Sequence, residues 1–258
     1  LGGLAETQDV LWVAAAMSPD DKRWAEGADH SEQLVEGIRL KLVSPTEEAY
    51  NKYYHHISNP LLWFIQHQLW DAPRSPNITG DTWDAWENGY VKVNQEIASG
   101  VIDSVKGEER PICIFPQDYQ LYLVPKYLRE ALGNRVQIQP FIHIPWPSHD
   151  AMSILPKKMR DDLLYSLLDS DRIGFQTRKD AFNFVQTCRY FLPDVTSRGH
   201  RDRLFMGERV IAAKAYPISV DIDKVQSLVE QTETELLKSQ LINFISDRKL
   251  ILRVDRIE

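Results

Sequence analysis

Short apolar runs alternate with amphipathic stretches from residue 111 onward, and this alternation restricts the folds that the chain can adopt. The apolar runs read as strands over 111–115, 136–144, 172–177, 209–220 and 249–255. Apolar residues at helical spacing occupy 120–132, 160–171, 178–191 and 221–246 between them. Strands that alternate with helices favour a parallel sheet with helices on both faces. We therefore predict an α/β, Rossmann-like fold that binds ligands at the carboxyl edge of its sheet.

The first 110 residues follow a less regular pattern. Residues 10–17 and 38–45 read as strands, and 83–105 read as a helix. Residues 46–70 read as a helix that breaks near Pro60. Tryptophans concentrate before residue 90, which is typical of a core, although aromatic rings also stack on the apolar faces of sugars.

The composition is that of a globular protein, with 43% apolar and 26% charged residues among 258. No run approaches the roughly 18 apolar residues that span a bilayer, and the start does not read as a signal peptide. A net charge of −7 argues against a nucleic-acid surface. Two cysteines, Cys113 and Cys188, make no disulfide framework, so we expect both to be reduced and buried in a cytoplasmic protein.

Three histidines, His55, His56 and His67, lack metal-ligand spacing because adjacent residues face different sides of a helix. We expect neither a metal nor another cofactor. The chain begins at leucine and stops just as an apolar strand finishes, so we expect it to be part of a longer polypeptide. The sequence leaves homo-oligomerisation open.

Asp118 and His143 each follow an apolar strand, and both are candidate site residues. Asp118 precedes a helix, so its position fits a helix cap, a ligand-binding carboxylate at the sheet edge, or both. A histidine on a strand is more often a core residue than a reactive one. However, Pro145 and Pro147 stiffen the turn after His143, and a rigid turn is what a functional site needs to hold its side chains in place. The glycines at 2 and 3 form either an ordinary turn or a loop that lets a phosphate or sugar approach the backbone.

Seven stretches, in order along the chain, resemble the trehalose-6-phosphate synthase family of retaining glycosyltransferases. They are GGL at 2–4, YYHHISNPLLW at 53–63, QDYQLYLVPKYLRE at 117–130, FIHIPWPS at 141–148, LLDSDRIGFQT at 167–177, AYPISVD at 215–221 and VDRIE at 254–258. The resemblance implies the GT-B architecture, in which two Rossmann-like domains face a cleft. Residues 1–246 would then form the amino-terminal, acceptor-side domain. Residues 247–258 would be the first strand of the carboxy-terminal, nucleotide-sugar domain.

The resemblance also implies roles for individual residues. On the acceptor side, Tyr54 and Trp63 look like pocket residues, and Asp118 looks like the carboxylate that meets the acceptor hydroxyls. On the donor side, the matching residues are those expected to contact phosphates or the donor sugar: Gly2, Gly3, His143 and Arg256. Arginine suits a diphosphate because it makes bidentate contacts.

The reaction implied is transfer of glucose from a nucleoside-diphosphate glucose to glucose 6-phosphate, with retention of configuration and without a metal. The protein would position the substrates and stabilise charge on the leaving phosphates. We expect residues 1–258 alone to be inactive, because part of the nucleotide pocket lies beyond them. The sequence departs from the family at Gln117, where a histidine is usual, and after Trp63, where the family has a proline and a tyrosine.

These departures leave two alternatives open. One is a transferase with another acceptor or donor, such as a glucosylglycerol-phosphate synthase or a cyclitol pseudo-glycosyltransferase. The other is a non-catalytic module that binds sugar phosphates.

Overall fold

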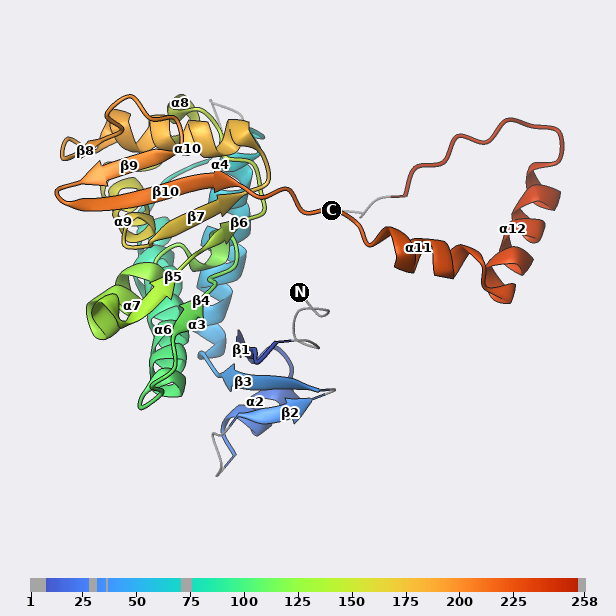
Figure 1. Cartoon of the computed structure of the whole chain (residues 1–258), viewed down its shortest axis with the longest axis horizontal. Coiled ribbons are helices and arrows are strands. Elements are labelled where there is room, and N and C mark those ends of the chain that lie inside the picture. Colours follow the sequence, from blue (N-terminus) through green and yellow to red (C-terminus); the bar gives the residue numbers. More distant parts are fainter. Residues whose placement is uncertain (1–7, 28–31, 36, 71–75, 255–258) are drawn as a thin grey trace. The chain divides into compact units, whose positions relative to one another are not determined.

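A computed structural model describes residues 8–27, 32–35, 37–70 and 76–254. Contacts between residues divide the chain into one unit that ends at Pro217 and a second that begins at Ile218 (Figure 1). Each unit is described by itself below. Among the described residues, no helix is both long and apolar enough to cross a membrane.

Parallel strands form the centre of the first unit, as the alternation predicts. Strand β4 (Ile112–Ile114) pairs in parallel with β5 (Val136–Ile138). A second sheet has the order β6-β7-β10-β9-β8, in which β6, β7 and β10 are parallel and β8 and β9 add antiparallel edges. Its strands are β6 (Phe141–Ile142), β7 (Arg172–Phe175), β8 (Val195–Thr196), β9 (Arg203–Met206) and β10 (Arg209–Ala215).

The strand predicted over 136–144 is split into β5 and β6. Pro140 lies between them and has no amide hydrogen for the ladder. Backbone hydrogen bonds continue on both sides of it, from Gln139 to Ile114 at 2.8 Å and from Phe141 to Pro116 at 3.0 Å. The segment 112–118 therefore runs alongside both short strands.

Helices between the strands bury their apolar faces against the sheets. Helix α7 (Val124–Leu132) packs on β5 and on α9 (Lys157–Leu168), and α10 (Arg178–Phe191) packs on β7 and β10. The short helices here are η3 (Tyr119–Leu121), η4 (Gly133–Arg135) and α8 (His149–Met152). The inward face of α10 carries Ala181, Phe184, Val185 and Cys188, at helical spacing. Phe182 on the same helix is exposed because the buried stripe lies to one side of it.

Before β4, a smaller sheet and two long helices complete the first unit. Strand β1 (Leu11–Ala15) pairs in parallel with β3 (Ile38–Val43), and β2 (Gln33–Val35) pairs antiparallel with β3. The remaining short helix here is α2 (Pro19–Ala25). The first long helix comprises α3 (Glu47–Asn51), the π-helix η1 (Lys52–Trp63) and α4 (Phe64–Gln66). The second comprises α5 (Gly80–Ala85), the π-helix η2 (Trp86–Val91) and α6 (Lys92–Val105).

The break predicted near Pro60 does not occur. The helix passes through Pro60 as part of η1, whose wider turns displace the carbonyl that a proline ring would meet in an α-helix. The Ser58 hydroxyl donates a hydrogen bond to the carbonyl of Tyr53, five residues earlier, at 2.8 Å. The two π-helices cross at Gly89, where a Cβ would lie 2.5 Å from the Cβ of Lys52.

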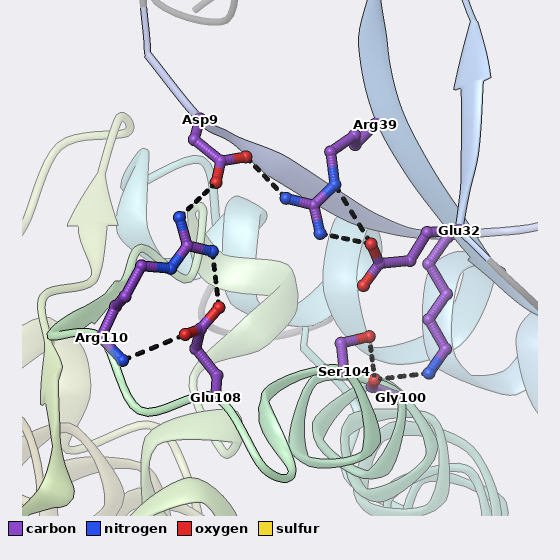
Figure 2. A network of polar contacts seen from close by, with 8 residues as sticks. Asp9, Glu32, Arg39, Gly100, Ser104, Glu108 and Arg110 are labelled. Carbon is purple, nitrogen blue, oxygen red and sulfur yellow. Dashed lines mark hydrogen bonds and ion pairs between the residues drawn. The ribbon is translucent and has the colours of Figure 1, made fainter.

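A network of charged side chains joins the small sheet to the chain just before β4 (Figure 2). The Asp9 carboxylate accepts from Arg39 at 2.6 Å and from Arg110 at 2.9 Å. Arg39 also pairs with Glu32, and Arg110 with Glu108 at 2.5 Å. Two arginines thus share one carboxylate, and residues about 100 positions apart are held together.

The two cysteines differ in exposure. Cys188 is buried in α10, as predicted, but Cys113 in β4 is exposed. Among the strands that the structure describes, β4 pairs with β5 alone. Because alternate residues of a strand face opposite sides, Cys113 points away from the core. The prediction that both thiols are buried is therefore wrong for Cys113.

The second unit contains α11 (Ile222–Val229) and α12 (Thr232–Ile245). The single helix predicted over 221–246 is thus two helices, separated at Glu230 and Gln231. Of the predicted last strand, the described part, 249–254, is not in strand conformation. A strand forms only where a neighbouring strand pairs with it. The assignment of 247–258 to a second domain stays a prediction.

Candidate active site

Asp118 lies at the point where the segment beside β6 ends. Gln117 still pairs with Phe141, and the Asp118 amide donates to the Phe141 carbonyl at 2.8 Å. The Asp118 backbone has φ 65° and ψ −173°, a conformation that is essentially restricted to glycine. Such a conformation costs about 1–3 kcal/mol and persists only where surrounding contacts enforce it. Strain of this kind concentrates at functional sites.

The Asp118 side chain does not cap the helix that follows it. Although Asp118 immediately precedes η3, its carboxylate makes no capping hydrogen bond there. Its Oδ1 instead accepts a hydrogen bond from the backbone amide of His143 at 3.1 Å. The sequence leaves two roles open for Asp118. The structure excludes the role of helix cap and leaves that of a ligand-binding carboxylate at the sheet edge.

The half-buried position of Asp118 affects its charge. Partial burial raises the pKa of the carboxyl above its usual value, while hydrogen bonds from backbone amides, that of His143 first among them, oppose the rise. Its Oδ1 atom accepts a hydrogen bond in surroundings where water competes less than at an open surface.

His143 follows β6 directly and is half-buried rather than enclosed in the core. Its Nε2 lies 2.9 Å from the Oε1 atom of Gln117. Its ring contacts that of Phe141, with centroids 4.7 Å apart. The two candidate residues, each of which follows an apolar strand in the sequence, are thus neighbours in the structure, joined by the hydrogen bond from the His143 amide to Asp118.

Helix α10 fixes the turn that carries His143. The Trp146 amide donates to Asp180 at 3.0 Å, and the Trp146 indole donates to Thr187 at 3.2 Å. Asn183 donates to the Trp146 carbonyl at 2.9 Å. Residues 180, 183 and 187 were not predicted as site supports, although their spacing puts three polar side chains on one face of the helix.

The turn after Asp118 is held by the two long helices. The Tyr119 hydroxyl donates to Asn59 at 2.8 Å, and the Tyr90 hydroxyl donates to the Tyr119 carbonyl at 2.5 Å. Asn94 accepts from the Leu123 amide at 3.1 Å. Asn94 and Tyr90 are buried, so the network is shielded from water and fixes the turn firmly. In the sequence, this network is indicated only by Asn94, a lone asparagine on the apolar face of a helix.

Tyr54 and Trp63 both lie on η1 and are half-buried. Tyr54 stacks on Tyr50, with centroids 5.8 Å apart, and Trp63 packs on His67 at 4.1 Å. Asn59 lies between them in the sequence and reaches the Asp118 turn through Tyr119. The same helix thus contacts the turn and carries both rings, whose acceptor role stays a prediction.

Three predicted site residues, Gly2, Gly3 and Arg256, lie outside the described residues. The arrangement that the structure does describe is a half-buried carboxylate and an imidazole at neighbouring strand ends. Buried hydrogen bonds from neighbouring helices fix the turns that follow both groups. Such a pair is suited to orienting hydroxyl groups of a bound ligand.

Comparison with known proteins identifies the family. The model of glycosyltransferase family 20 matches residues 1–258, the whole chain. The chain belongs to glycosyltransferase family 20. The resemblance found in the sequence motifs is therefore confirmed, and Asp118 and His143 are strand-end residues of a family 20 glycosyltransferase chain.

Curated proteins similar to this chain include two kinds of transferase. An alpha,alpha-trehalose-phosphate synthase [UDP-forming] of Candida albicans is 28% identical over 264 residues, which cover 100% of this chain and 51% of that protein. A validamine 7-phosphate valienyltransferase of Streptomyces hygroscopicus subsp. jinggangensis is 29% identical over 209 residues, 76% of this chain and 41% of that protein. The chain spans about half of these relatives or less.

Solved structures confirm the predicted α/β fold of a GT-B glycosyltransferase. The N-terminal domain of Candida albicans trehalose-6-phosphate phosphatase has a TM-score of 0.76 at 25% identity, covering 95% of this chain and 50% of that one. An Escherichia coli structure described as bound with UDP-2-fluoro glucose has a TM-score of 0.73 at 24% identity, covering 93% and 50%.

Proposed function

We propose that this family 20 chain is the acceptor-side part of a retaining glycosyltransferase that moves glucose from a nucleoside-diphosphate glucose to glucose 6-phosphate. The observation that carries the proposal is the strained Asp118 backbone, which aims a half-buried carboxylate at the amide of His143. A fold has no need of this strain, whereas a site that must hold a carboxylate in one place does. The similarity to trehalose-phosphate synthases supports the choice of substrates.

In this proposal Asp118 accepts hydrogen bonds from hydroxyl groups of the acceptor, and His143 contacts the donor sugar. Tyr54 and Trp63 line the acceptor pocket, while Gly2, Gly3 and Arg256 contact the donor and its phosphates. As the sugar–phosphate bond breaks, the acceptor hydroxyl attacks from the same face, and its proton leaves with the diphosphate. The residues contribute mainly by holding the two substrates in reacting geometry.

The test uses the longest natural polypeptide that contains residues 1–258. It is incubated with UDP-, GDP- or ADP-glucose, with and without glucose 6-phosphate, and release of the nucleoside diphosphate is measured. We expect release with one donor that depends on glucose 6-phosphate. Failure to release with any donor and acceptor overturns the transferase, and release only with another acceptor overturns the choice of acceptor.

A different acceptor is the second candidate, and a specific relative favours it. The validamine 7-phosphate valienyltransferase is as similar to this chain as the synthases are, and its name also contains a phosphorylated cyclic compound. Including a cyclitol phosphate and glycerol 3-phosphate in the same assay separates the two candidates.

A non-catalytic module remains the third candidate because a similar structure is a domain of a phosphatase. A non-catalytic module would bind glucose 6-phosphate, which would raise the thermal midpoint of unfolding, but it would release no nucleoside diphosphate in the assay.

A further inference from the structure

The side-chain amide of Gln117 contacts the imidazole ring of His143. This contact determines which ring nitrogen of His143 carries a proton. The Gln117 amide nitrogen donates to the backbone carbonyl of Phe115 at 3.0 Å. Its oxygen lies 2.9 Å from Nε2 of His143. A backbone carbonyl can only accept a hydrogen bond, so the amide nitrogen must face Phe115 and the amide oxygen must face the imidazole.

An oxygen that only accepts requires a hydrogen on the atom opposite. We infer that Gln117 is a positioning residue that fixes neutral His143 in the tautomer protonated at Nε2, with its lone pair on Nδ1. The histidine then offers Nδ1 as an acceptor to a ligand group that carries a hydrogen, such as a sugar hydroxyl.

The strained backbone of Asp118 explains how neighbouring residues can both reach His143. In a regular strand, successive side chains point to opposite faces. Here Gln117 contacts the ring of His143, and Asp118 contacts its backbone amide. The positive φ of Asp118 breaks the alternation directly after Gln117, so residues 117 and 118 hold the histidine at two points.

The assignment of the proton stands on these contacts alone, whereas its use in catalysis rests on the proposed function. If His143 meets the donor sugar, Gln117 sets which sugar group it can bind: one that donates to Nδ1.

The test is a long-range ¹H–¹⁵N correlation spectrum of the full polypeptide with labelled histidine, recorded about two pH units above the ordinary histidine pKa. Loss of one signal set in His143→Gln assigns His143. We expect Nε2 to be protonated in the native protein. We expect Gln117→Leu to lower the ratio of the Nε2–H to the Nδ1–H tautomer about twofold to tenfold, the effect of one net hydrogen bond.

Two further variants sharpen the result. Gln117→Glu keeps an acceptor opposite the ring, so Nε2 should stay protonated. Gln137→Leu changes an exposed glutamine on β5 and should leave the His143 signals unchanged. Two results would overturn the inference. One is a native His143 protonated at Nδ1. The other is a tautomer ratio that changes no more in Gln117→Leu than it does in Gln137→Leu. Because the spectrum needs no turnover, its outcome is independent of the transferase assay.

Discussion

At the scale of single residues, the site depends on the positive φ of Asp118, whose carboxylate accepts a hydrogen bond from the backbone amide of His143. The sequence places Asp118 and His143 each after an apolar strand, and the structure makes them neighbours. The positive φ of Asp118 could not be predicted, because it depends on the carbonyl of Phe141, 23 positions along the chain. The exposure of Cys113 also escaped prediction, because it depends on which strands become neighbours.

The strain at Asp118 predicts an unusual order of stabilities. Asp118→Gly should be more stable than Asp118→Ala by about 1–2 kcal/mol, because both lose the hydrogen bond to His143 but only glycine tolerates the positive φ. Chemical denaturation measures the difference. Ala131, exposed on α7, is the matched control: Ala131→Gly should lower stability by about 0.5–1 kcal/mol. If alanine is as stable as glycine at position 118, the backbone there is not strained.

At the scale of elements, supports from neighbouring helices hold the site. Helix α10 fixes the turn after His143, and the two long helices fix the turn after Asp118. The bounds of α10 follow from the sequence because its apolar spacing is regular between Thr177 and Leu192. The passage of a helix through Pro60 does not, because it depends on the wider turns of the π-helix η1.

The crossing of η1 and η2 predicts that Gly89 cannot be replaced. In Gly89→Ala the new methyl group would lie 2.5 Å from the Cβ of Lys52 and 2.7 Å from the Tyr53 nitrogen, so the helices must move apart. We expect a loss of about 1–3 kcal/mol in the free energy of unfolding. Gly80→Ala, at the start of α5 with open space around it, is the control and should be neutral or slightly stabilising. Equal stability of the two variants would show that the helices are less closely packed at Gly89.

At the scale of the first unit as a whole, exposed charges rather than a continuous sheet join β1 and β3 to the chain before β4. Hydrogen bonds from Arg110 lower the pKa of Glu108 from 4.5 to about 2, and Arg110 and Arg39 lower the pKa of Asp9. An acid whose folded pKa is lowered stabilises the fold above its unfolded pKa. That contribution is lost as the pH falls toward the folded pKa.

This network predicts a pH-dependent stability between about pH 4.5 and 2. The thermal midpoint of the native protein should fall more steeply over this window than that of Arg110→Gln, which leaves Glu108 and Asp9 closer to their ordinary pKa values. The difference should shrink in about 1 M salt, because Asp9 is exposed and Glu108 is partly exposed, so salt screens both acids. Parallel curves at low salt would show that the network does not couple to folding.

The central claim is that Asp118 and His143 form the reaction centre of a glucosyl transfer. The most direct test measures turnover of the longest natural polypeptide that contains this chain, with its best donor and glucose 6-phosphate. Two variants are compared: His143→Ala and, as the control, His200→Ala, which changes an exposed histidine before β9. We predict that His143→Ala loses about 100-fold or more in kcat while its thermal midpoint stays within a few degrees of the native value. We predict that His200→Ala keeps native turnover. Native turnover in a folded His143→Ala, or loss of turnover only together with loss of the fold, would contradict the account.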